Sequence, residues 1–114
     1  MNFLYCLVIQ TTITKTSFST GTLLHTATVN EAAKANSVFA LFIMQSIIRH
    51  RNNDWGDCCE EDWNLNDLAV SEKGRILSVY DLPKDLKSIH PNEKIWIITE
   101  WDRTYTTILF PSEY

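Results

Sequence analysis

Glycine, proline and cysteine are scarce in this chain, and each shortage argues against a class of site. The 114 residues include three glycines, three prolines and three cysteines. So few glycines, with no Walker loop and no G-x-S-x-G sequence, disfavour a phosphate cradle or a serine nucleophile. An odd cysteine count without C-x-x-C spacing disfavours a zinc site, so we expect free thiols at Cys6, Cys58 and Cys59 and no cofactor.

Runs of positive charge and long hydrophobic segments are also missing. The formal net charge is −4, and without a Lys/Arg-rich run direct nucleic-acid binding is not expected. The apolar start, residues 3–9, is far shorter than the ~20 residues that cross a bilayer, and it lacks the positive flank of a signal peptide. We therefore expect a cytoplasmic protein with no membrane partner. Self-association is left open.

The order of strand and helix signals predicts a single α+β domain over residues 1–114. Residues 1–16 are expected to be a variable N-terminal strand or extension. We predict about three helices on one face of an antiparallel sheet of three to five strands. The expected strands are 3–14, 18–27, 75–80, 94–100 and 104–110, the last two forming a hairpin. The expected helices are 29–35, 38–50 and 58–73, with N-caps at Thr28, Asn36–Ser37 and Asp57.

The second of these helices begins with an unusual run, because residues 38–44 are apolar on every side. A helix of this kind is either buried centrally or covered by a partner. In a domain of this size, central burial is expected.

The densest group of charged and aromatic side chains lies in residues 49–63. The helix dipole explains part of its acidity, since carboxylates are favoured in a first helical turn. Trp55 stands beside charges in an expected loop, where an interface anchor and a lid over the core are equally compatible with the sequence. With an acidic rim it would suit a basic partner. The predicted binding surface is Asp54, Trp55, Asp57, Glu60 and Glu61, together with Trp101 and Arg103 of the hairpin.

A second polar group is predicted by the helical wheel. Asp62 and Asn66, one turn apart, fall within the apolar arc of their helix, so they need partners. We expect a buried polar network that ties this helix to the C-terminal sheet. The alternative is a ligand-binding or catalytic site that adds Glu100, Asp102 and Arg103, with the two carboxylates as an acid–base pair.

Several short segments resemble a group of small proteins carried on plasmids and other mobile elements, often labelled only "plasmid-related". The resemblance covers roughly the last 65 residues well. The segments that carry it are 21–24, 54–57, 60–62, 66–67, 75–80, 96–100, 102–103 and 106–114.

The resemblance implies cargo of a mobile element. Small acidic cargo of this kind is often an anti-defence factor, similar in role to anti-restriction or anti-CRISPR proteins. We therefore expect a non-enzymatic module that binds a host protein, itself basic or nucleic-acid-binding. The alternative is the small enzyme or ligand-binding protein built on Asp62, Asn66 and the residue 100–103 hairpin.

Overall fold

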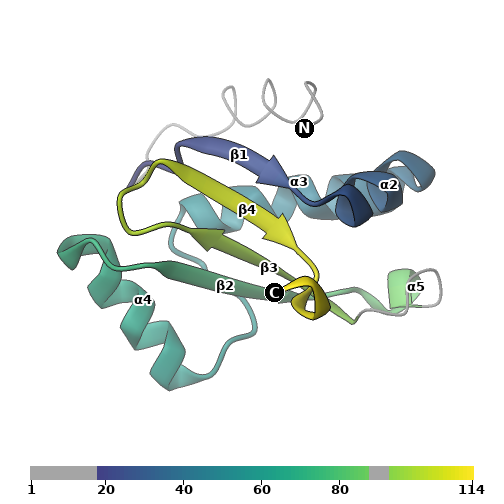
Figure 1. Cartoon of the computed structure of the whole chain (residues 1–114). Coiled ribbons are helices and arrows are strands. Elements are labelled where there is room, and N and C mark those ends of the chain that lie inside the picture. The colour runs from purple at the N-terminus through teal and green to yellow at the C-terminus, as the bar shows by residue number, and fades with distance from the viewer. Residues whose placement is uncertain (1–17, 88–92) are drawn as a thin grey trace.

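The computed structural model describes residues 18–87 and 93–114, which form an α+β domain (Figure 1). The expected strand over residues 3–14, and with it Cys6, lies outside the described residues. The elements, in chain order, are β1 (Thr22–His25), α2 (Ala27–Ala35), α3 (Ser37–Arg51), α4 (Glu60–Glu72), β2 (Ile76–Asp81), α5 (Lys84–Lys87), β3 (Lys94–Thr99), β4 (Tyr105–Leu109) and the short 3-10 helix η1 (Pro111–Glu113).

The four strands form one mixed sheet in the order β1-β4-β3-β2. The predicted hairpin is confirmed, since β3 pairs antiparallel with β4, and β2 pairs antiparallel with β3. The expectation of a purely antiparallel sheet was wrong, because β1 lies parallel to β4. A parallel pair needs a long crossover, and here the whole segment from α2 to β3 separates β1 from β4.

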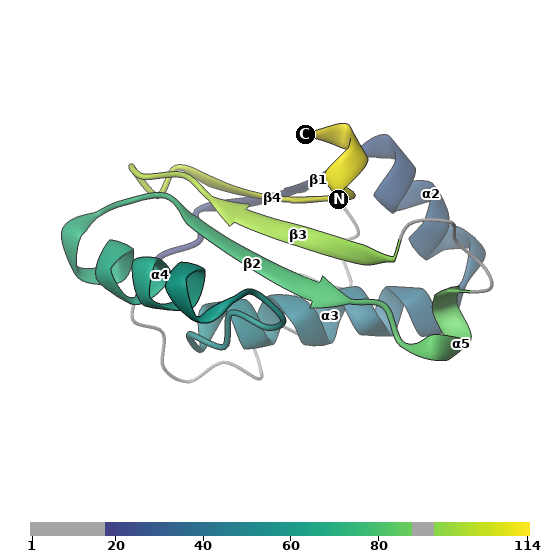
Figure 2. The same cartoon turned by 90° about the horizontal axis from the view of Figure 1, so that it is seen from below.

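Helix α3 lies across one face of the sheet, as Figure 2 shows from below. Its inner side chains Phe39, Ile43 and Ile47 join a buried cluster with sheet residues such as Ile97 and Ile108. The expected central burial of α3 was wrong. The sheet covers only one side of the helix, and apolar residues remain exposed on the other side. Within the described residues, no helix has the length and hydropathy to span a membrane.

Capping side chains set the starts of α2 and α3, and one of the two caps differs from the prediction. Asn36 caps α3 as predicted, its Oδ1 accepting from the amides of Val38 and Phe39 at 2.9 and 3.2 Å. Helix α2 starts two residues before the prediction, because Thr26 and not Thr28 accepts from the amide of Val29.

Helix α4 has Cys59 at its N-cap in place of Asp57. It ends at Glu72, and its C-cap Lys73 takes the left-handed conformation (φ 57°). Asp57 does not cap the helix because its Oδ2 accepts from the amide of Asp81 in strand β2.

Candidate functional site

Trp55 is part of the core, which corrects its expected role as a surface anchor. Its side chain is 0% exposed, and its indole nitrogen donates to Asp67 Oδ1 at 2.8 Å. Its ring packs against Phe18 and His50, with centroids 5.9 and 5.8 Å apart. Charged neighbours in the sequence suggested a surface position. However, the loop folds back beside β2 and turns the indole inward.

The same loop extends the sheet at the free edge of β2. Gly56 forms a parallel bridge with Val79, flanked by hydrogen bonds from Val79 N to Trp55 O (3.0 Å) and from Asp57 N to Val79 O (2.6 Å). A Cβ at Gly56 would lie 2.0 Å from Val79 O, so only glycine fits here. Asp57 Oδ2 then accepts from the amide of Asp81 at 2.9 Å. The backbone and side chain of Asp57 therefore bind strand β2.

The side chain of Asn66 binds the backbone of β2 at the same edge, two residues before Val79. Its Nδ2 donates to Leu77 O at 2.8 Å, and its Oδ1 accepts from Leu77 N at 3.1 Å. Asn66 is buried, as expected, and bonds to the C-terminal sheet. Asp62 is exposed, which corrects the expectation that both residues are buried. Figure 1 shows the reason. The C-terminal end of α4 lies beside β2, whereas the first turn of α4 lies away from the sheet.

Asp54 forms a surface ion pair at the end of α3. Arg49 donates to its two carboxylate oxygens at 2.7 and 3.1 Å, and this contact lowers the pKa of Asp54. Oδ1 also accepts from the amide of Gly56 at 3.1 Å. The backbone oxygen of Asp54 accepts from the hydroxyl of Tyr80 at 2.6 Å. Asp54 thus fixes the loop, and its carboxylate is only partly free for a partner.

The polar side chains of the hairpin also form hydrogen bonds within the domain. Arg103 donates to Gly74 O at 2.6 Å and to Ala69 O at 2.8 Å, so it binds one carbonyl group in the last turn of α4 and one just after the helix. Asp102 accepts from the amide and hydroxyl of Thr104 at 3.1 and 2.6 Å and closes its own turn.

Glu100 lies 3.5 Å from Arg75 Nε in an ion pair at the surface. Glu100 and Asp102 therefore contact different partners, which gives little support to an acid–base pair. Trp101, by contrast, is 63% exposed at the hairpin tip.

A buried polar network around His50 was not predicted. The ring nitrogens Nδ1 and Nε2 of His50 lie 2.6 Å from Ser78 Oγ and 2.8 Å from Thr99 Oγ1. Thr99 and Thr106 hydroxyls are 2.7 Å apart, and Thr106 donates to Thr20 O at 2.7 Å. The network thus joins α3 to three strands. Burial lowers the pKa of His50 to about 3, so the ring is neutral at physiological pH.

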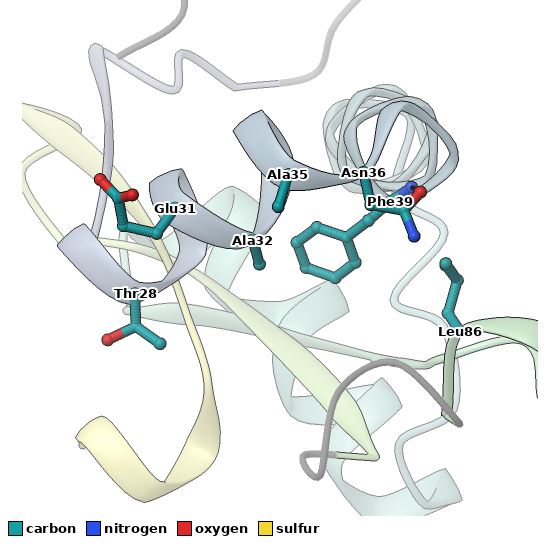
Figure 3. A pocket seen from close by; sticks show the side chains of 7 residues that line it. All are labelled: Thr28, Glu31, Ala32, Ala35, Asn36, Phe39 and Leu86. Carbon is teal, nitrogen blue, oxygen red and sulfur yellow. Dashed lines mark hydrogen bonds between the residues drawn. The ribbon is translucent and has the colours of Figure 1, made fainter.

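An apolar hollow of about 310 Å³ lies between α2, the start of α3 and α5. Figure 3 shows the Phe39 ring between Ala32 and Ala35 on one side and Leu86 on the other. The Glu31 carboxylate points away from that ring, and the Asn36 amide oxygen already caps α3. Hence the hollow has a mainly apolar lining. It lacks the convergent polar groups that orient a substrate.

A second hollow, of about 230 Å³, is lined by Asp62, Leu65, Asn66, Arg75 and Leu77. It contains two residues of the alternative site, but the Asn66 amide is already occupied by Leu77. Among the described residues, no group of three or more His, Cys, Asp or Glu side chains could hold a metal ion.

The outer side of α4 is acidic and presents two exposed leucines. Leu65 and Leu68 are 57% and 51% exposed. Glu61, Leu65, Leu68 and Glu72 follow a 4-3-4 spacing, which puts them on one face of the helix. This spacing was readable in the sequence. We call this face, with Glu60 of the first turn, the α4 surface.

No protein-family model, curated protein or solved structure matches this chain.

Proposed function

We propose that the protein is a non-enzymatic binding module whose α4 surface docks on a basic surface of a host protein. The observation that carries this proposal is the charge of one element. Helix α4 holds five carboxylates and no basic side chain, whereas the formal net charge of the whole chain is −4. The negative charge of the molecule is therefore concentrated on one helix, which favours a positively charged partner.

Leu65 and Leu68 supply the apolar part of the docking surface. Helices that bind in a groove commonly use apolar anchors at this spacing, surrounded by polar groups. Exposed leucines of this kind would contribute most of the affinity, while Glu60, Glu61 and Glu72 would speed association. The partner that fits is a protein with an apolar groove bordered by Lys or Arg.

The inner side of α4 supports the same proposal, because it holds the helix in one orientation. Asn66 bonds to β2, Asp67 accepts from Trp55, and Arg103 binds the C-terminal carbonyl groups. A helix held in this way loses little conformational entropy on binding. Trp101 lies two residues before Arg103 in the chain, so the exposed hairpin tip is available as a secondary contact at the end of α4.

The resemblance to plasmid-related proteins supports a role as cargo of a mobile element. In that setting we propose a host protein as the partner. By analogy, inhibition of a defence protein, of the anti-restriction or anti-CRISPR type, is the role that fits best.

Capture of partners by the tagged chain from a host cell tests the proposal. One partner should recur with the wild-type chain and should be lost with the double variant Leu65→Ser/Leu68→Ser. We expect this variant to weaken the binding free energy by about 2 kcal/mol or more. Leu24→Ser is the matched control, because Leu24 is 43% exposed on β1 and far from α4 in the sequence. The proposal fails if the double variant retains the partner as well as the control does.

A further inference from the structure

The hollow of about 230 Å³ lies where α4 meets the start of β2. Its lining combines two leucines with one acidic, one basic and one amide side chain, namely Leu65, Leu77, Asp62, Arg75 and Asn66. Pockets for drug-sized molecules measure about 300–1,000 Å³. The hollow lies below that range, so its size suits one side chain of a partner better than a whole substrate.

The polar side chains of the lining are occupied, with the exception of Asp62. The Asn66 amide donates to and accepts from the backbone of Leu77. Arg75 forms an ion pair with Glu100, and its guanidinium donates to the hydroxyl of Tyr114. Asp62 is exposed and forms no hydrogen bond or ion pair with the residues that the structure describes. Its carboxylate is therefore available to a ligand.

The charge and the walls of the hollow select the chemistry of that ligand. Arg75 and Glu100 neutralise each other as a pair, so the Asp62 carboxylate determines the sign of the charge. Leu65 is 57% exposed and Leu77 is half-buried, which gives the hollow apolar walls. A long basic side chain fits this arrangement, because its stem packs on apolar surface while its charged head stays at the edge.

The two walls belong to different elements, and Asn66 fixes their separation. Asn66 lies on α4 one residue after Leu65, and its two bonds attach it to the Leu77 backbone in β2. The hollow is therefore formed before a ligand arrives. A preformed site loses less conformational entropy on binding than one that must be ordered.

We propose that this hollow binds an arginine side chain of the host protein. The inference rests on the proposed function, since Leu65 belongs both to the α4 surface and to the hollow. The arginine stem would lie between Leu65 and Leu77, and the guanidinium would donate to the Asp62 carboxylate. Arginine suits this position better than lysine, because its planar head can bond both carboxylate oxygens and is less strongly hydrated.

A titration of the full chain with N-acetyl-arginine amide, followed by ¹H–¹⁵N NMR spectra at constant ionic strength, tests the proposal. The amide signals of Asp62, Leu65 and Leu77 should shift in a saturable way. N-acetyl-citrulline amide is the matched probe, because citrulline has the same stem and an uncharged head. It should bind about threefold more weakly, which is the size of effect expected for an exposed ion pair.

Asp62→Asn should weaken the arginine probe by about the same factor and leave the citrulline probe unchanged. Glu61→Gln is the matched control, because it removes the same charge from the neighbouring residue, which does not line the hollow. This control should keep the wild-type affinity. Both positions are exposed, so signals elsewhere in the spectrum should not move and will report an intact fold.

The proposal is overturned if no saturable shift occurs at the hollow or if the two probes bind equally. Equal weakening by Asp62→Asn and Glu61→Gln would overturn it as well. These results are separate from the test of the proposed function. If the host protein is lost with Leu65→Ser/Leu68→Ser but the hollow does not bind the arginine probe, only the present inference fails. If the hollow binds the probe but the host protein is retained, the proposed function fails and the arginine site stands.

Discussion

His50 is buried at the centre of the domain, where its ring nitrogens are bonded to two hydroxyl groups. Ser78 and Thr99 supply these hydroxyls, and Phe18 and Trp55 pack against the ring. In the neutral imidazole one ring nitrogen donates to a hydroxyl and the other accepts from one, so both contacts suit the uncharged ring. Burial and the positive charges of Arg103 and Arg51 disfavour the protonated form. His50 therefore stabilises the fold only while it is uncharged.

The stability of the domain should fall with acidification because of His50. The unfolded histidine titrates near 6.5, whereas the pKa of folded His50 is about 3. Between these values the unfolded chain binds the extra proton, so the free energy of unfolding decreases as pH falls below about 6.5. The expected slope approaches 1.4 kcal/mol per pH unit. Denaturant unfolding at pH 6.5, 5.8 and 5.0 measures it.

A His50→Gln variant should be less stable at pH 7 but should lose most of this slope. The control is His25→Gln, because His25 is only partly buried, so its removal should change the slope less. Equal slopes in the wild type and His50→Gln would contradict the assignment.

Single polar contacts hold α4 in position against the rest of the domain. Asn66 attaches its middle to Leu77, and Arg103 attaches its last turn to the hairpin. Its first turn has no side-chain N-cap bond. The carboxylates there gain from the helix dipole instead. The helix is thus firmly held at its C-terminal half and more exposed at its acidic start.

Arg103→Gln should destabilise the domain by about 1–3 kcal/mol, because carbonyl groups at the end of α4 lose a charged donor. Gln also carries a Cβ, so the cost of the left-handed backbone at this position (φ 62°) is unchanged. Arg75→Gln is the control, since Arg75 is exposed and forms a 3.5 Å surface ion pair. Surface pairs contribute about 0–1 kcal/mol. Denaturant unfolding measures both, and equal losses would refute the capping role.

Local signals predicted those elements that depend on neighbouring residues. The hairpin strands and the Asn36 cap were found because spacing and capping chemistry lie within a few positions. The parallel pairing of β1 was missed, because it depends on a strand about 80 residues away in the sequence. Burial of Trp55 depends on the loop returning to β2. The helical wheel placed Asp62 and Asn66 together, but it carries no information on how far α4 extends beyond the sheet.

At the scale of the whole molecule, charge separates the two helices that lie against the sheet. Helix α4 is acidic with two exposed leucines, while α3 is uncharged through Ile48 with Val38 and Leu41 exposed. Surfaces that differ this much suit different partners. We propose that α4 binds a basic host protein.

Site-specific photo-crosslinking in a host cell tests the central claim most directly. A photoreactive amino acid at position 68 should crosslink to one recurring basic protein, since Leu68 is 51% exposed on the α4 surface. The same group at Leu24 on β1 should not capture that protein. The yield at position 68 should also fall when Glu60 and Glu61 are both replaced by glutamine, because rim charges speed association. Equal capture from positions 24 and 68, or no recurring protein from position 68, would contradict the assignment of α4 as the binding surface.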